Sequence, residues 1–344
     1  MTLLENLVPK EAGRFQVLDG WRGISILAVL ACHLLPIGPH TWLLNEAAGY
    51  FGMALFFALS GFLITNFLLH HTSVVDFLIR RTFRILPLAW IALTIGLWMA
   101  HADSERYIAN FFFFANIPPF WLTDVTGHFW SLCVEIQFYA GIAILFAILG
   151  PRGLLLLPVV CLGITALRVH ETMYGSIVTY YRVDEILAGA TLALVYNDKL
   201  GQIAKAFLQR VNPWILIVLL VISTHPAARF MDYFRPYLSA TLIGATLMQP
   251  DSQFARAMRS KTLAYVAAIS YALYVVHPML EATWLGSGAK LVKYAKRPLL
   301  FVAVFLVAHI STSYYEHRWI EFGKRLSARF QAWAAKSRIR ASSI

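Results

Sequence analysis

Long apolar runs divided by short polar stretches dominate the pattern of this chain. Many runs are about 15 to 22 residues long, close to what a helix needs to cross a hydrocarbon core of about 30 Å. The runs lack the two-residue alternation of barrel strands. Because backbone polar groups must be satisfied internally in lipid, the pattern predicts an all-α integral membrane protein, a bundle of about ten transmembrane helices. The expected spans are 17–38, 50–70, 85–100, 129–149, 154–169, 183–196, 213–224, 237–249, 264–285 and 299–318.

Two segments depart from this pattern. Residues 101–128 hold four consecutive phenylalanines at 111–114 and the pair Pro118 and Pro119. The segment is too interrupted for a crossing and too aromatic for a free loop, so we expect a re-entrant or interfacial segment. From Glu321 onward the chain is rich in Lys and Arg. We therefore divide the chain into a transmembrane domain, 1–320, and a basic cytoplasmic tail, 321–344, that lies on the membrane surface.

The composition indicates a membrane protein, and the placement of the charges decides what the net positive charge means. Hydrophobic residues make up 59% of the 344 and charged residues only 14%, with a mean hydropathy of +0.63, which excludes an ordinary soluble fold. A net charge of +11 can indicate nucleic-acid binding. However, with ten spans and the N-terminus in the cytoplasm, most Lys and Arg fall on the cytoplasmic side. The charge thus favours a topological role, with both termini cytoplasmic and no nucleic-acid partner.

Neither a disulfide framework nor a metal site nor a cleaved leader is expected. The three cysteines, Cys32, Cys133 and Cys161, lie in apolar runs without metal-ligand spacing. The first sixteen residues are mixed and polar, with no apolar core before a small-residue cleavage site. We expect the first span itself to direct membrane insertion.

The first predicted span carries two ionisable residues on one face. Arg22 and His33 are eleven residues apart, which on a helix is about 20° in azimuth and about 16 Å along the axis. Arg22 is then near the cytoplasmic lip and His33 well inside the membrane, where an ionisable side chain is costly and marks a candidate functional site. The alternatives are a histidine that only packs between helices and an arginine that only anchors the end of the span.

The span at 129–149 places a carboxylate at a similar depth. Glu135 is predicted about 9 Å below the outer end of its span, and His33 about 20 Å above the inner end of its own. In a hydrocarbon core of about 30 Å these are similar depths, so the two side chains can meet. A carboxylate beside an imidazole raises its basicity, as needed to remove a proton from an attacking hydroxyl. Alternatively, Glu135 pairs with an arginine and locks two helices together.

Other polar positions also have two interpretations. Arg81 and Arg84, at the start of the third span, could hold the phosphates of a soluble donor or serve topology alone. Asp184 lies at a polar span boundary, where it could orient another polar group. His277 directly precedes Pro278, which should disturb the helix. The pair could therefore serve a helix kink and packing just as well as His277 could take part in chemistry.

These positions fall in motifs that resemble the acyltransferase family 3 membrane proteins. The matching stretches are, in chain order, Leu18-Asp19-Gly20 with Arg22 and His33, residues 56–64, Arg81 with Arg84, residues 130–139, residues 182–184 and residues 270–277. The resemblance covers essentially the whole chain. The chain departs from the family at Ile136, where a second glutamate is common, and we expect no secreted esterase-like domain of the kind that some relatives carry.

The resemblance implies transfer of an acyl group, usually acetyl, to a hydroxyl, most often on a glycan at the extracytoplasmic face of a bacterial inner membrane. It implies acetyl-CoA as the donor and no metal, with the acyl-CoA, a glycan or lipid-linked sugar and the bilayer as partners. It also implies that His33 and Glu135 are catalytic. Our hypothesis is that His33, supported by Glu135, activates the acceptor hydroxyl or transiently carries the acyl group.

Further site residues follow from the same motifs. The resemblance places Arg22, Arg81 and Arg84 near the path of the acyl donor. Substrate-binding or supporting roles are expected for Asp19, His128, Trp130, Tyr139, Asp184 and His277.

A proton-coupled transporter or flippase for a small or lipid-linked substrate is the competing class. Arg22, His33 and Glu135 would then form a proton or substrate path. The sequence shows neither an inverted repeat nor a matching pair of broken helices, which disfavours this class. A sensor or a structural membrane protein would leave the buried charges without a purpose.

Overall fold

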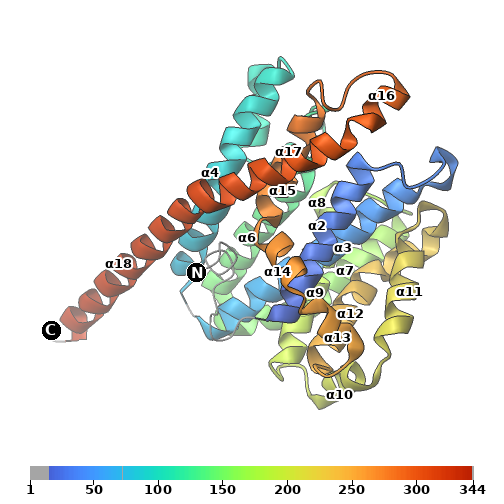
Figure 1. Cartoon of the computed structure of the whole chain (residues 1–344). Helices are drawn as coiled ribbons and strands as arrows, with labels where there is room; N and C mark the ends of the chain where they lie inside the picture. The colour runs from blue at the N-terminus through green and yellow to red at the C-terminus, as the bar shows by residue number, and fades with distance from the viewer. Residues whose placement is uncertain (1–14, 72, 343–344) are drawn as a thin grey trace.

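The structure is a computed structural model that describes residues 15–71 and 73–342, with side chains described to residue 334. All regular secondary structure in these ranges is helical, which confirms the predicted all-α class (Figure 1). The elements are α2 (Gln16–Leu34), η1 (His40–Trp42), α3 (Leu44–His70), α4 (Val74–Met99), α5 (Ser104–Phe111), η2 (Gly127–Phe129), α6 (Trp130–Leu149), η3 (Gly150–Leu156), α7 (Leu157–His170), α8 (Thr179–Arg182), α9 (Asp184–Tyr196), α10 (Gln202–Arg210), α11 (Pro213–Thr224), η4 (Pro226–Phe234), α12 (Arg235–Met248), α13 (Gln253–Met258), α14 (Lys261–Ala268), α15 (Ser270–Glu281), α16 (Lys290–Ala295), α17 (Arg297–Ile310), η5 (Ser311–Glu316) and α18 (His317–Ser342).

Among the described residues, fewer helices than the predicted ten have the length and hydropathy of a membrane crossing. Five helical stretches are long and apolar enough to cross: Gln16–Leu34, Leu44–His70, Val74–Met99, Gly127–His170 and Arg297–Ala334. Counting each of two bent pairs as one span raises the number to seven. The bundle of ten crossings is therefore not confirmed, although the protein has the helices of a multi-pass membrane protein.

Helix length explains part of the difference. The predicted spans 183–196 and 237–249 do form helices, α9 and α12, but these have 13 and 14 residues. Helices of that length extend only about 20 Å, short of a core of about 30 Å. The spans predicted at 129–149 and 154–169 belong to one helical stretch of 44 residues, in which Gly150 takes a left-handed φ of 62° between α6 and η3. Only glycine adopts that conformation without steric cost.

Of the two bent pairs, only one interrupts a predicted span. Helix α10 meets α11 at 93°, and α14 meets α15 at 64°. The second break divides the predicted span 264–285 at Ile269, so α15 begins inside the bundle rather than at its end.

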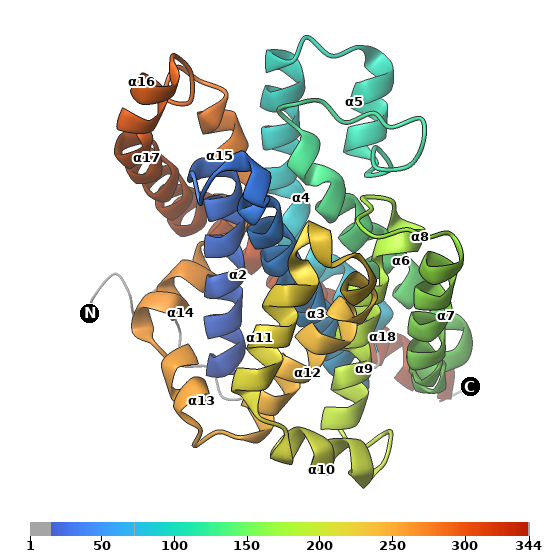
Figure 2. The ribbon, with the colours of Figure 1, turned by 90° about the vertical axis from the view of Figure 1, so that its right-hand side faces the viewer.

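Helix α3 lies at the centre of the bundle, between α2 and α9 (Figure 2). Its contact with α9 depends on glycines: a Cβ atom on Gly61 would lie 1.8 Å from the carbonyl oxygen of Ile186, and one on Gly189 would lie 1.9 Å from that of Ala58. The two backbones touch because neither position carries a side chain.

The end of α2 lies short of the predicted end at residue 38. Helix α2 stops at Leu34, and the next residue, Leu35, is extended. The residue before a proline disfavours the helical conformation, and Pro36 follows here. His33 therefore lies in the last turn of α2 with an exposed side chain, not deep in a longer helix as the sequence predicted.

The segment 101–128 folds as α5 followed by turns and by η2. Helix α5 packs against α4, and the segment stays at one end of the bundle (Figure 2). The segment is therefore not an additional crossing, which agrees with the prediction.

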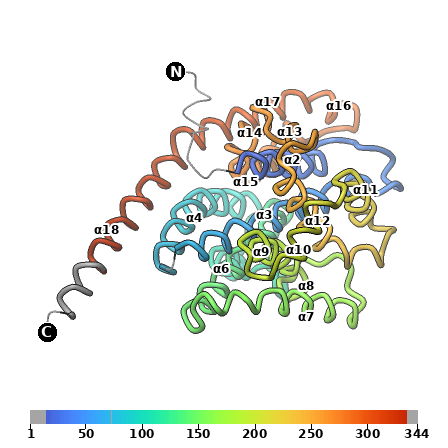
Figure 3. The backbone as a smooth tube through the Cα atoms, turned by 90° about the horizontal axis from the view of Figure 1, so that it is seen from below, coloured from blue at the N-terminus to red at the C-terminus, as the bar shows by residue number. Residues whose placement is uncertain are grey.

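The predicted boundary at residue 320 does not coincide with an end of a helix. Helix α18 begins at His317, follows η5 and α17, and continues past Glu321. Phe83 of α4 packs against its Trp319 and Phe322, and the helix then leaves the bundle (Figure 3). Residues 1–14 of the predicted domain, and the side chains of Lys336, Arg338 and Arg340 in the predicted tail, lie outside what the structure describes.

Candidate active site

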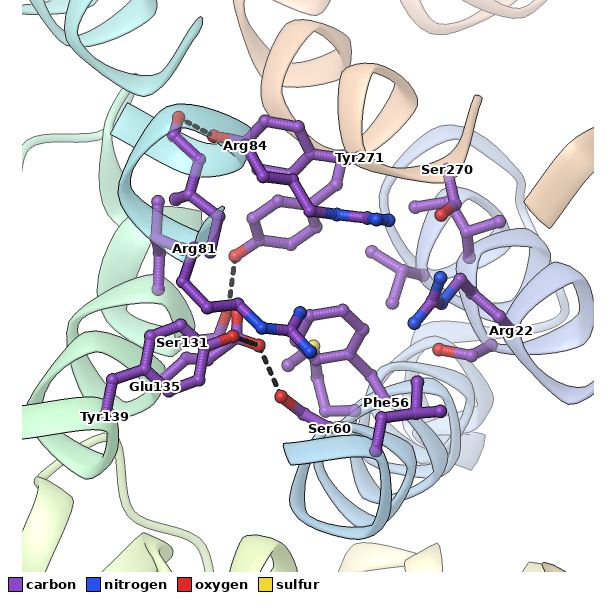
Figure 4. Close-up of a pocket in the computed structure, with 18 residues that line it drawn as sticks. Arg22, Phe56, Ser60, Arg81, Arg84, Ser131, Glu135, Tyr139, Ser270 and Tyr271 are labelled. Carbon is purple, nitrogen blue, oxygen red and sulfur yellow. Dashed lines mark hydrogen bonds between the residues drawn. The ribbon is translucent and has the colours of Figure 1, made fainter. Parts of the chain in front are cut away.

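A pocket, partly open to the outside, lies between α2, α3, α4, α6 and α15 (Figure 4). Three of its polar lining residues are the cations Arg22, Arg81 and Arg84 that the sequence placed near a donor. Glu135 lines the same pocket from α6. Its other polar lining residues are Ser25, Ser60, Ser131, Tyr139, Ser270, Tyr271 and Tyr274.

The lining has a positive charge balance, with three guanidinium groups against the one carboxylate of Glu135. Two further carboxylates act on the cations from outside the lining: Asp19 attracts Arg22, and the buried Glu316 of η5 attracts Arg84. The guanidinium of Arg81 lies 5.8 Å from the centre of the Tyr139 ring, a cation–π contact. The wall that faces the cavity is therefore suited to an anionic ligand.

Hydroxyl groups, rather than a cation, hold Glu135. Its Oε1 accepts hydrogen bonds from the hydroxyls of Ser60 on α3 and Tyr139 one turn further along α6. The residue is 6% exposed. The sequence indicated Tyr139 through its motif but missed Ser60, because a serine in an apolar run most simply indicates packing.

Three histidines gather beside the end of α2. The ring of His33 lies 5.2 Å from that of His277 on α15, and the His277 ring lies 5.6 Å from that of His128 on η2. His128 and His277 are buried, whereas His33 is exposed. We call His33, His128 and His277 the histidine cluster. Its residues come from three distant segments of the chain, and the sequence analysis named each of them as a candidate site residue.

Tyr274 and Ser131 connect this cluster to the pocket. Tyr274 lines the pocket, and its ring lies 5.3 Å from that of His128 and 6.1 Å from that of His277. Ser131 Oγ lies 2.6 Å from the Tyr274 hydroxyl, which in turn donates to the backbone carbonyl of His128. Because Ser131 lies one turn before Glu135 on the same face of α6, polar groups continue from the carboxylate to the histidines.

Glu135 and His33 do not form the direct pair that the sequence suggested. Within the described residues no hydrogen bond or ion pair joins them, and His33 is not part of the pocket lining. The early end of α2 places His33 at the edge of the bundle, while Glu135 lies inside it. The nearest aromatic ring to His33 is that of His277.

Two more predicted residues lie outside the pocket lining. Asp184 belongs to a buried ion-pair network, in which it lies 2.5 Å from Arg168 Nη1. Trp130 stacks edge-on against Phe57, at 5.8 Å between ring centres, and the Arg182 guanidinium lies 5.4 Å from its ring.

The rest of this network was not predictable as a unit. Asp232 pairs with both Arg168 and Arg235, and Arg235 Nε lies 2.6 Å from Glu185 Oε1. Its members come from α7, α9, η4 and α12. The described residues contain no group of three or more side chains placed to hold a metal ion.

The fold and the site together define a multi-pass helical membrane protein with a polar, cation-lined pocket among its central helices. The sequence profile of the family described as Acyltransferase domain matches residues 15–317, and the chain belongs to this family. The resemblance carried by the motifs is thereby confirmed.

Similar proteins include named O-acetyltransferases. The chain is 26% identical to the peptidoglycan O-acetyltransferase OatA of Listeria monocytogenes, over 87% of this chain and 54% of that protein. It is 25% identical to the putative peptidoglycan O-acetyltransferase YrhL of Bacillus subtilis, over 76% and 47% of the two chains. A putative O-acetyltransferase of Staphylococcus aureus is 24% identical, over 76% and 49%. The chain thus spans about half the length of these curated relatives. No solved structure matches it.

Proposed function

We propose that this protein is a membrane-embedded O-acyltransferase of a bacterial inner membrane. It transfers an acetyl group from acetyl-CoA, bound from the cytoplasm, to a hydroxyl of a glycan on the other side. The observation that carries the proposal is the convergence of Arg22, Arg81 and Arg84 on one pocket that also holds Glu135. Membership of the acyltransferase family and the names of the relatives support the reaction class.

The pocket suits the donor in charge and in the surface it offers. Guanidinium groups form strong paired hydrogen bonds with phosphate, and CoA carries several phosphates. The aromatic side chains of Phe56, Tyr271 and Tyr274 offer apolar surface to the rest of the donor.

The proposed orientation places the donor and acceptor at opposite ends of α2. Arg22 is near the start of this helix and His33 at its end, about 16 Å apart along the axis. With the N-terminus in the cytoplasm, the flexible arm of CoA extends from the cations toward the histidine cluster. The acceptor approaches the exposed His33 from outside.

The reaction then needs one proton transfer in each direction. His33 takes the proton of the acceptor hydroxyl, whose oxygen attacks the thioester carbonyl. The carbon–sulfur bond breaks, and the departing thiolate of CoA receives the proton. The oxygen ester remains on the acceptor. The relatives' names make peptidoglycan fragments the first acceptor to test.

The transporter alternative gains no support from the two bent helix pairs. A transporter site of that kind lies between matching broken helices from two halves of the chain. Here only the break before α15 reaches the pocket, through Ser270 and Tyr271, and no residue of α10 or α11 lines it.

The test is acetyl transfer by purified protein in nanodiscs, with acetyl-CoA and peptidoglycan fragments. Free CoA thiol and the mass of the acetylated product are both measured. We expect the double variant R81Q/R84Q to raise the KM and the Kd for acetyl-CoA at least about tenfold, because each lost cation removes a charge-assisted contact that is present before and during reaction.

A matched control removes two arginines that lie outside the pocket. Arg152 and Arg256 are exposed and do not line it, so R152Q/R256Q changes the net charge equally but should leave both constants unchanged. Wild-type protein that neither binds acetyl-CoA nor transfers acetyl to any supplied glycan would refute the proposed function. Equal effects of the two double variants would restrict Arg81 and Arg84 to a topological role.

A further inference from the structure

His277 is buried and has one ring nitrogen without a hydrogen-bond partner among the described residues. The side chain is fully buried, and its Nδ1 lies 3.0 Å from the backbone carbonyl oxygen of Leu273. Since a carbonyl only accepts hydrogen bonds, the proton of the neutral ring is on Nδ1. Nε2 is then an acceptor, and it has no hydrogen-bond partner among the described residues. A buried polar atom without a partner is rare and calls for an explanation.

The closest ring to His277 is that of the proposed catalytic base. The centres of the His33 and His277 rings are 5.2 Å apart, with 47° between the ring planes. A hydrogen bond between two imidazoles, at about 3 Å from nitrogen to nitrogen, places their centres roughly 5 Å apart. The separation of the two ring centres therefore already suits an N–H···N hydrogen bond. One of the two rings only has to turn to bring its nitrogen into line.

His33, rather than His128, is the neighbour that is free to supply this rotation. The His33 side chain is exposed, so its ring can turn at little cost. His128 also has ring nitrogens without a partner among the described residues, but it is buried, and its ring centre lies 5.6 Å from that of His277. Its ring lies 4.5 Å from that of Phe129 and 5.3 Å from that of Tyr274. The close packing of His128 fixes its ring in place.

We propose that His277 is the positioning residue for His33. Nε2 of His277 accepts a hydrogen bond from one ring N–H of His33 and so leaves the other nitrogen of His33 unprotonated toward the acceptor hydroxyl. This assignment rests on the proposed function, in which His33 is the base. It gives His277 the orienting role that the sequence suggested for Glu135, whose Oε1 is engaged by Ser60 and Tyr139.

The hydrogen bond acts at the moment of proton transfer. When the hydroxyl proton moves to the free nitrogen of His33, that ring becomes positively charged while its other N–H still points at the neutral His277. The bond strengthens as the charge develops, so it stabilises the transition state more than the ground state. His277 itself neither gains nor loses a proton in this step.

Two substitutions of similar size separate positioning from packing. In H277N the amide nitrogen takes the place of Nδ1 and can still donate to Leu273, but nothing occupies the place of Nε2. In H277Q the amide reaches the place of Nε2, and its oxygen can accept from His33. We expect H277N to lower kcat for acetyl transfer on the order of 100-fold, the size of effect caused by a small misplacement of a reacting group. We expect H277Q to recover at least about tenfold over H277N.

Donor binding is measured alongside and should not change. The Kd for acetyl-CoA depends on the cation-lined pocket, which His277 does not line. The matched control is H309N: His309 on α17 lies 3.0 Å from the Tyr265 hydroxyl, outside the pocket and the histidine cluster, and its loss should leave kcat unchanged.

Failure of this inference is distinguishable from failure of the proposed function. The proposed function requires active wild-type protein and an inactive H33A variant. If both hold, then H277N with full activity overturns the inference, as does H277Q that is as inactive as H277N at normal protein level. A loss of donor affinity in H277N would assign His277 to the pocket and overturn it as well.

Discussion

Glu135 is held by two neutral donors, so its charge is not cancelled by a bonded cation. Ser60 and Tyr139 satisfy Oε1, while the nearby Arg81 stacks on the Tyr139 ring rather than forming an ion pair with the carboxylate. Replacement of both hydroxyl donors would leave a buried carboxylate without compensation, which is costly. At the scale of single residues, the pocket therefore presents a carboxyl group held by hydroxyls opposite its three cations.

E135Q tests whether this charge takes part in the reaction. Glutamine keeps the size of the side chain and an oxygen that can accept the two hydroxyl bonds, so the protein should unfold at a similar temperature. If Glu135 is catalytic, acetyl transfer should fall about 100-fold or more, the usual contribution of an acid–base group. The initial rate of acetyl transfer by purified protein is measured for E135Q. The comparison is S60A, which removes one hydrogen bond to Glu135 but keeps its carboxyl group. Full activity of E135Q would confine Glu135 to a structural role.

At the scale of helices, glycine contacts decide how closely the central elements approach. Gly61 and Gly189 bring α3 and α9 into backbone contact, and this contact sets the place of Ser60 next to Glu135. By contrast, a Cβ atom on Gly141 of α6 would meet nothing within 4 Å. Gly61 is therefore a closely packed glycine position and Gly141 an open one, in two helices that line the same pocket.

G61A should destabilise the protein, whereas G141A should not. The added methyl group at position 61 would lie 1.8 Å from the Ile186 carbonyl oxygen, so α3 and α9 must separate. Overpacking of this kind costs about 1–3 kcal/mol, while alanine at an open helical position gains up to about 1 kcal/mol over glycine. Thermal unfolding in detergent compares the two variants. Equal melting temperatures would show that the α3–α9 contact does not limit stability.

The sequence predicted elements well where local pattern decides them. The apolar runs indicated α3, α4 and α11, and the spacing of Arg22, Arg81, Arg84 and Glu135 in motifs indicated residues that do meet in one pocket. Contacts that a serine makes with a residue far away in the sequence were not predictable. Ser131 with Tyr274 and Ser60 with Glu135 are separated by 143 and 75 positions, and neither serine differs locally from a packing residue. The break at Ile269 has no proline or glycine to mark it.

At the scale of the whole molecule, a buried ion-pair network holds together the helices on the side of the bundle away from α4. Arg168, Arg182 and Arg235 balance Asp184, Glu185 and Asp232, so the six side chains are electrically neutral together. All six are buried, and none lines the cation-lined pocket. The network joins α7, α8, α9, η4 and α12, and α3 packs against α9 and α12 of this set.

D232N tests the network as a unit. Asp232 bridges Arg168 and Arg235, so the substitution leaves two buried guanidinium groups with one carboxylate partner fewer each. Removal of one partner from a buried ion pair typically costs about 3–5 kcal/mol, because the remaining charge is not compensated. We therefore expect a clearly lower melting temperature in detergent, with an unchanged Kd for acetyl-CoA in the protein that remains folded, since the pocket is a separate site.

D198N is the control for this substitution. Asp198 lies 2.8 Å from Lys205 on the exposed surface and has a left-handed φ of 57°, which asparagine tolerates. Exposed ion pairs contribute only about 0–1 kcal/mol, so D198N should unfold within a few degrees of the wild type. A D232N variant as stable as D198N would mean that the network does not hold these elements together. A D232N variant that keeps its stability but loses acetyl-CoA binding would instead couple the network to the pocket.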